Sequence, residues 1–140
     1  MNLPVWMLLG FAAWTVLLLA ATVGVYRWSL ILPGTVAIAN FRADPVEGAD
    51  WYRRGTRAHA NCIENLPVFG AIVFALQVGN VTGTLVNTLA TAILVARVIQ
   101  SLVHTCFVQT NTAVSIRFGF YSVQLVSFLW LIGIVVARLW

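Results

Sequence analysis

Four long apolar segments limit what this chain can fold into. They cover about residues 3–27, 58–78, 85–108 and 114–136, and a polar loop at about 40–56 separates the first two. An α-helix needs roughly 20 apolar residues to cross the hydrocarbon core of a bilayer, and each segment is long enough. Only 9% of the 140 residues are charged, which is too few to cover the surface of a soluble domain. The segments therefore predict four membrane-spanning helices.

The connections between the last three segments are short. Residues 79–83 and 109–112 contain glycine or asparagine, which are typical of turns. Short connections place successive helices side by side and antiparallel. We therefore expect a single domain over residues 1–140, an all-α, up-down bundle of four helices in the membrane.

The charged residues favour a membrane-flanking loop over a nucleic-acid surface. The net charge is +4, all eight basic residues are arginines, and four of them lie between Arg42 and Arg57. Asp44, Glu47 and Asp50 are mixed among them, so the loop is not a continuous basic patch. Arginine and lysine are enriched in cytoplasmic loops of membrane proteins. We therefore expect the first loop in the cytoplasm and both termini on the opposite side.

Other kinds of site find little support in the sequence. Cys62 and Cys106 lack the CxxC spacing of zinc and redox sites, and two buried thiols are expected instead. The chain contains no GxGxxG, P-loop or HExxH motif. Neither a metal site nor a nucleic-acid partner is therefore expected.

Polar and ionisable residues recur at helical spacing within the last three segments. A charge at the centre of a membrane helix costs about 2.5–3.5 kcal/mol, so such residues face the bundle interior or a wet cavity. Residues spaced at i, i+3 or i+4 and i+7 share one helix face. The three sets are Arg57, Asn61 and Glu64; Arg97, Gln100 and His104; and Arg117, Tyr121 and Gln124.

These polar faces are expected to meet near the cytoplasmic surface. Arg57 and Arg117 each begin a segment from that side, and His104 lies where another segment ends there. A pocket between them would be cationic with Glu64 as its acid, and it would suit a small anion that carries an amino group. The alternative is a polar packing face, in which Glu64 pairs with an arginine of another helix and the remaining polar groups only join helices.

The second segment begins with a recognisable signature. The stretch from Arg57 to Phe69, RAHANCIENLPVF, follows the pattern Arg-Ala-x-x-Asn-x-x-Glu and then Pro and Phe. It resembles the second-helix signature of the MAPEG family, the membrane-associated proteins of eicosanoid and glutathione metabolism. The resemblance covers nearly the whole chain, because four spans and a polar first loop agree with the family. It implies a homotrimer that binds glutathione between neighbouring subunits from the cytoplasmic side.

The resemblance also implies roles for individual residues. Arg57, Asn61 and Glu64 would hold glutathione, with Glu64 at its amino group and the arginines at its carboxylates. Arg117 would be the catalytic residue, since it matches the fourth-helix arginine that stabilises the thiolate. A cation beside a thiol favours the thiolate, which is the nucleophile.

Two alignments of the third segment fit the family, and both add candidates for glutathione binding. One matches His104, Arg117 and Tyr121 to a histidine, arginine and tyrosine of the same spacing. The other matches Arg97, Gln100 and His104 to the family's third-helix motif and requires a connection four residues longer. All five residues therefore remain candidate site residues.

The resemblance implies a glutathione-dependent membrane transferase or peroxidase that acts on lipophilic electrophiles arriving from the bilayer, with glutathione as co-substrate. A non-catalytic protein of the same fold that binds or presents lipid is the alternative. Val108 and Phe118 favour it, because the family often has tyrosine and serine at these positions. A small transporter is a third hypothesis, but the polar residues cluster towards one membrane side, whereas a transport path should continue across.

Overall fold

The computed structural model describes residues 2–42 and 46–140, and within these ranges the chain is helical with no strand. The first helix is continuous, although a π-helical turn interrupts its α-helical hydrogen bonding. A short 3-10 turn, Ile38–Asn40, lies in the first loop. The elements are α1 (Leu3–Leu19), the π-helical turn (Ala20–Gly24), α2 (Val25–Ile31), α3 (Asp50–Val78), α4 (Thr84–Cys106) and α5 (Asn111–Leu139).

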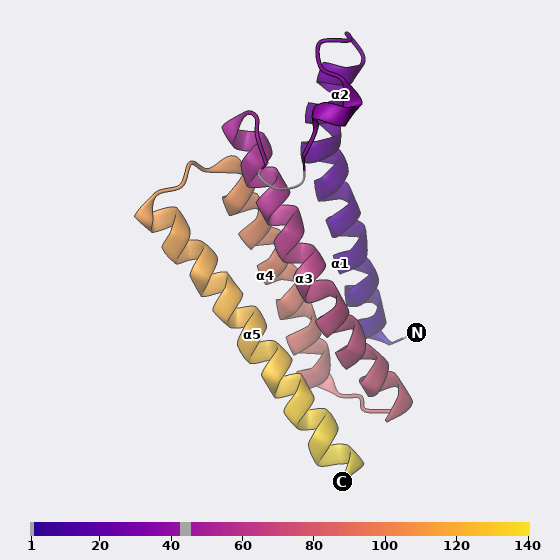
Figure 1. The fold of residues 1–140 in the computed structure, drawn as a ribbon. Helices are drawn as coiled ribbons and strands as arrows, with labels where there is room; N and C mark the ends of the chain where they lie inside the picture. The colour runs from indigo at the N-terminus through magenta and orange to yellow at the C-terminus, as the bar shows by residue number, and fades with distance from the viewer. Residues whose placement is uncertain (1, 43–45) are drawn as a thin grey trace.

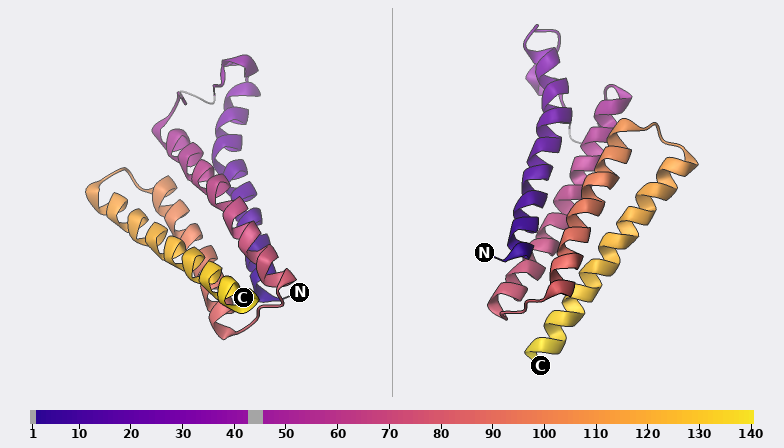
Figure 2. Two further views of the ribbon diagram at one scale, coloured as in Figure 1. Left: turned by 60° about the horizontal axis from the view of Figure 1, so that its bottom comes forward. Right: turned by 180° about the vertical axis from the view of Figure 1, so that it is seen from behind.

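Four helices are long and apolar enough to cross a membrane, which confirms the predicted four-helix membrane bundle. They are Leu3–Ile31, Asp50–Val78, Thr84–Cys106 and Asn111–Leu139. Successive helices run in opposite directions, and both termini lie at the end of the bundle away from the connection between α2 and α3 (Figures 1 and 2). α4 packs against α5, and α1 packs against α3 and α4.

The first two membrane-spanning helices are longer than the sequence suggested, so the connection between them is shorter than expected. The first helix extends to Ile31, and α3 begins at Asp50, so the last part of the expected polar loop is helical. Asp50 lies in the first turn of α3, where a carboxylate interacts favourably with the helix dipole. Arg53 and Arg54 pair with it from the next turn. These charged residues therefore indicate the membrane surface, and they do not interrupt the helix.

Aromatic rings connect the helices in the core of the bundle, and large apolar side chains cover its outer surface. Phe11 of α1 packs on Phe69 of α3 with ring centroids 5.8 Å apart, and Phe69 packs on Phe128 of α5 at 6.1 Å. Phe74 and Trp130 are 70% and 53% exposed. In an aqueous protein such exposure would be costly, but in a membrane these side chains contact lipid.

A cluster of rings fastens the first loop to the start of α3. Tyr26 stacks on Tyr52 with ring centroids 4.1 Å apart, and its hydroxyl accepts a hydrogen bond from Ala49 N at 3.3 Å. Arg27 Nε donates to the Tyr52 hydroxyl at 3.0 Å, and its guanidinium lies 5.4 Å from the Phe41 ring centroid. We call Tyr26, Arg27, Phe41 and Tyr52 the aromatic clasp. It holds the beginning of α3 against α2.

The first helix approaches α3 closely at the π-helical turn. A β-carbon built on Gly55 would lie 2.6 Å from Thr22 Cβ and 2.8 Å from its hydroxyl. Thr22 is β-branched and its hydroxyl already donates to Leu18 O at 2.6 Å, so it cannot turn aside. The contact therefore requires glycine at position 55.

Replacing Gly55 by alanine should push the two helices apart. We expect Gly55→Ala to lower the free energy of unfolding by about 1–3 kcal/mol, the usual cost of overpacking. Thermal unfolding in detergent would measure it. Gly70→Ala is the matched control, because a β-carbon there meets no atom within 4 Å, and it should be neutral or slightly stabilising. Equal stability of the two variants would contradict the assignment.

Candidate functional site

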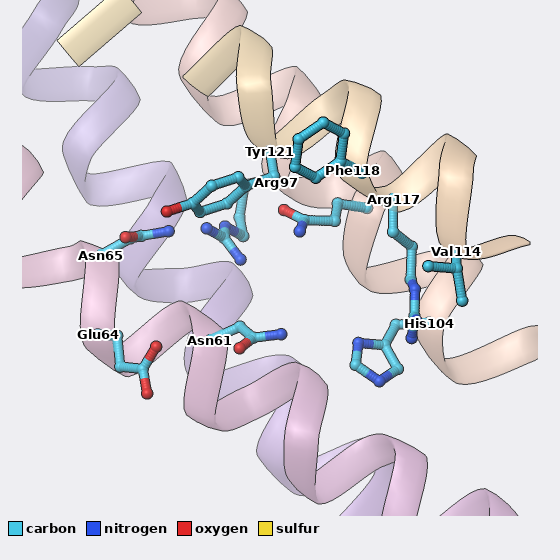
Figure 3. Close-up of a pocket in the computed structure, with 10 residues that line it drawn as sticks. Asn61, Glu64, Asn65, Arg97, His104, Val114, Arg117, Phe118 and Tyr121 are labelled. Carbon is cyan, nitrogen blue, oxygen red and sulfur yellow. The ribbon is translucent and has the colours of Figure 1, made fainter. Parts of the chain in front are cut away.

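A polar pocket of about 340 Å³ opens between α3, α4 and α5 (Figure 3). Seven of the eight residues that the sequence nominated line it, from three different helices. The pocket also has three lining residues that the sequence analysis did not nominate as site residues. The lining residues are Asn61, Glu64, Asn65, Arg97, Gln100, His104, Val114, Arg117, Phe118 and Tyr121.

Arg57 is the nominated residue that the pocket does not include. It is exposed and lies one turn before Asn61 on the same side of α3. At a rise of about 1.5 Å per residue, that turn displaces it by about 6 Å towards the end of the bundle. Arg57 therefore stands at the margin of the site and does not form its wall.

The α3 side of the pocket carries an unpaired carboxylate. Glu64 is exposed, and the ion pairs found within residues 2–42 and 46–140 join Asp50 to Arg53 and Arg54 instead. The packing alternative required Glu64 to pair with an arginine of another helix, and that pair is not formed among these residues. The Glu64 carboxylate is thus available to an incoming cation. Asn65 follows it on the wall and was missed, because it lies one residue off the predicted helix face.

The α4 side of the pocket is buried. Arg97 is 1% exposed, and Gln100 and His104 are also buried. Within the described ranges, the Arg97 Nε and Nη2 atoms have no hydrogen-bond partner. The guanidinium lies 5.6 Å from the Phe11 ring centroid, a cation–π contact that offsets part of its desolvation. Buried arginines are nearly always paired, so this one is an exception that a bound anion would remove.

The α5 side combines a cation with apolar groups. Arg117 reaches towards His104 of α4, and Tyr121 projects towards α3 (Figure 3). Thr110 accepts a hydrogen bond from Ala113 N at 3.2 Å, which fixes the start of α5 about two turns before Arg117. Phe118 lines the pocket and is 68% exposed.

The residues matched in the two alignments of the third segment all line this one pocket. His104, Arg117 and Tyr121 line it together with Arg97 and Gln100. Arg97, Gln100 and His104 share one face of α4, and Gln100 contacts Gln124 of α5 from that face. The helical periodicity that predicted the polar faces therefore also explains their convergence.

The pocket is positively charged overall, with one acid at its edge. Arg97 and Arg117 lie in its walls, and Glu64 faces them from α3. Among the described residues, no group of three or more His, Cys, Asp or Glu is placed to hold a metal ion. The arrangement can bind an anion on α4 and α5 while it holds an amino group on α3.

The two cysteines differ in environment. Cys62 is fully buried, and its sulfur lies 3.6 Å from the Ser101 hydroxyl. Cys106 is exposed, contrary to the expectation of two buried thiols. It is the last residue of α4, where the helix leaves the packed part of the bundle.

Fold and pocket together define a class of protein: a four-helix membrane protein with a cationic pocket inside the bundle. The chain belongs to the MAPEG family, whose model matches residues 4–137. This family includes glutathione transferases and peroxidases as well as non-catalytic members. Comparison with curated proteins and with solved structures found no significant match.

Removing the Arg97 charge should reduce anion binding without reducing stability. Because the buried guanidinium is incompletely paired, we expect Arg97→Met to keep the free energy of unfolding level or to raise it by up to about 4 kcal/mol. If glutathione, the ligand that the family resemblance implies, is the anion, it should raise the unfolding temperature of the unmodified protein by mass action, and this shift should disappear in the variant. A variant that is destabilised yet still responds to glutathione would show that Arg97 is structural.

Proposed function

We propose that this protein is a glutathione-dependent membrane transferase or peroxidase that acts on lipophilic electrophiles. The observation that carries the proposal is the convergence of Glu64, Arg97 and Arg117 on one pocket. Glutathione carries an amino group, carboxylates and a thiol, and each finds a complementary group there. The volume of about 340 Å³ lies at the small end of ligand pockets, which span roughly 300–1,000 Å³, and suits a short peptide.

Each wall has its own part in the proposed binding mode. Glu64 accepts hydrogen bonds from the amino group, and Asn61 lies one turn before it on α3. Arg97 and Gln100 donate to a carboxylate from the buried wall, and His104 borders the same region. Arg57 lies at the margin of the pocket, where it attracts the anion as it enters.

Arg117 is the catalytic residue in this proposal. Its guanidinium stabilises the negative charge on the glutathione sulfur, so a larger fraction of the bound thiol is ionised at neutral pH. Tyr121, one turn further on α5, offers a hydroxyl to the same atom. The thiolate then attacks the electrophilic carbon of the acceptor, and a carbon–sulfur bond forms as the leaving group departs with its electron pair. Val114 and Phe118 give the acceptor an apolar approach from the bilayer side.

The proposed assembly is a homotrimer with the first loop in the cytoplasm. Glu64 supports the oligomer, because it is exposed on a membrane-spanning helix, and such charges face protein or water and not lipid. A neighbouring subunit beside α3 would shield it and would place the glutathione site between subunits. The arginines at the start of α3 support the orientation.

Arg117→Ala should reduce the amount of bound thiolate at neutral pH. We expect the ultraviolet absorbance of glutathione thiolate to appear on adding glutathione to the purified protein. In the variant, the pH midpoint of this signal should move up towards the ordinary thiol pKa of about 8.5, since the stabilising cation is gone. The thiolate is the form present above the midpoint, so the variant loses signal at neutral pH and turnover should fall at least tenfold.

Glu64→Gln separates the catalytic proposal from its alternative. In a glutathione enzyme, the variant should weaken glutathione binding and lose conjugation across a panel of electrophiles. A protein that binds or presents lipid without glutathione would show no conjugation before the substitution and an unchanged lipid content after it. No thiolate signal, or one that Arg117→Ala leaves unaltered, would refute the proposed mechanism.

Cys106 provides a test of the orientation. It is exposed and is the last residue of α4, a helix that ends on the same side of the bundle as the connection between α2 and α3 (Figure 1). We expect a membrane-impermeant maleimide to label it only after cells are permeabilised, because that end faces the cytoplasm. Cys106→Ser should remove the label, since Cys62 is buried. Labelling of intact cells would contradict the proposed orientation and indicate the opposite one.

A further inference from the structure

A polar contact lies behind the pocket, where α5 packs on α4. Gln124 is fully buried, and its amide nitrogen donates to Gln100 Oε1 at 2.8 Å and to the carbonyl oxygen of Phe120 at 3.1 Å. Gln100 lines the pocket, whereas Gln124 does not. The contact therefore connects a residue outside the pocket to one of its walls.

The two hydrogen bonds determine which way both amides face. The Phe120 carbonyl can only accept, so the Gln124 atom beside it must be the amide nitrogen. The same nitrogen faces Gln100, so the Gln100 atom beside it must be the oxygen. If the Gln100 amide were reversed, N–H groups would face each other. The amide nitrogen of Gln100 is thereby turned away from Gln124, and Gln100 keeps its two N–H donors for the pocket that it lines.

Arg97 extends this donor surface along α4. It stands one turn before Gln100, and its guanidinium has donors but no acceptor. Two of its nitrogens, Nε and Nη2, are buried without a partner among the described residues. This part of the α4 wall thus offers hydrogen-bond donors and no acceptor.

The arrangement leaves one polar atom of the pair unsatisfied. Gln124 Oε1 is buried and has no hydrogen-bond partner within the described ranges. Most buried polar atoms are paired, because an unpaired one loses its hydration without compensation. An apolar side chain of similar size at position 124 would avoid this loss, so packing alone does not account for the glutamine.

We propose that Gln124 is a positioning residue that holds the Gln100 amide with its N–H groups towards the pocket, so that Arg97 and Gln100 together select an oxyanion. The chemical class of the group bound at this wall is a carboxylate, which accepts hydrogen bonds and donates none. The inference rests on the proposed function, because the carboxylate is taken to belong to glutathione. It assigns the carboxylate end of the ligand to α4 and the amino end to Glu64 of α3.

A double-mutant cycle tests whether Gln124 acts through Gln100. Glutathione binding to the detergent-purified protein is measured by calorimetry for Gln124→Met, Gln100→Leu and the double variant. We expect each single variant to raise the dissociation constant about tenfold, the effect of losing one hydrogen bond to a charged group. The double variant should bind no more weakly than either single variant. Multiplication of the two losses would overturn the inference, because it would show that Gln124 acts independently of Gln100.

Stability measurements separate positioning from a structural role. Gln124→Met should unfold at the same temperature as the unmodified protein or higher, because it removes an unpaired buried oxygen. Gln124→Leu is a second variant for the same comparison. Ser127→Ala is the control, since Ser127 is also buried on α5 but bonds to Val123 O of its own helix, and its dissociation constant should not change.

The outcomes distinguish this inference from the proposed function. No glutathione binding by the unmodified protein would overturn both. Normal binding that neither variant at position 124 weakens would overturn only the role of Gln124. Weaker binding in Gln124→Met that follows a fall in unfolding temperature would also overturn it, because the glutamine would then be structural.

Discussion

The free energy required to place polar groups in a bilayer is the constraint on which this structure depends. A charged or unpaired group on a membrane-spanning helix must face protein or water, because lipid offers no hydrogen bonds. The chain meets this constraint by turning the polar faces of α3, α4 and α5 towards a common space. The outer surface can then be covered by large apolar side chains such as Phe74 and Trp130. The pocket is therefore a direct result of helix orientation in the membrane.

Some polar groups in the described part of the chain lack a hydrogen-bond partner within the subunit, and two of the charged ones, Glu64 and Arg97, lie on facing walls of the pocket. Glu64 has no arginine partner, and Arg97 is buried with two nitrogens unpaired among the described residues. Elsewhere, buried hydroxyls bond to carbonyls of their own helices, as Thr22 and Ser101 do. A buried guanidinium with unpaired nitrogens, opposite a carboxylate without an ion-pair partner, is typical of a ligand site.

The structure brings seven of the eight candidate residues together, because helical periodicity and burial carry the same information. Residues at i, i+3 and i+7 had to share a face, and in a membrane that face had to turn inwards. Asn65 and Phe118 were not predicted, because whether a residue beside the main face lines a pocket depends on helix rotation and crossing. The start of α3 at Asp50 was also missed, since charged residues at a membrane surface can be helical. Arg57 shares a face of α3 with Asn61 and Glu64 but does not line the pocket. Periodicity gives the face on which a residue lies, whereas its position along the helix axis determines whether it reaches the pocket.

The aromatic clasp has a consequence for the segment that it encloses. Tyr26 and Arg27 at the end of the first span contact Tyr52 on the first turn of α3. The entry of the chain into α3 is thus fixed by side chains on the two helices. Phe41 and the backbone N–H of Ala49 complete these contacts from the connecting segment. The exposed turn at residues 32–35 makes none of them, and it can change in length or composition without displacing Asn61 and Glu64. That turn is therefore the part of the molecule where an epitope, a fluorescent label or a fusion partner can be inserted while the site keeps its geometry.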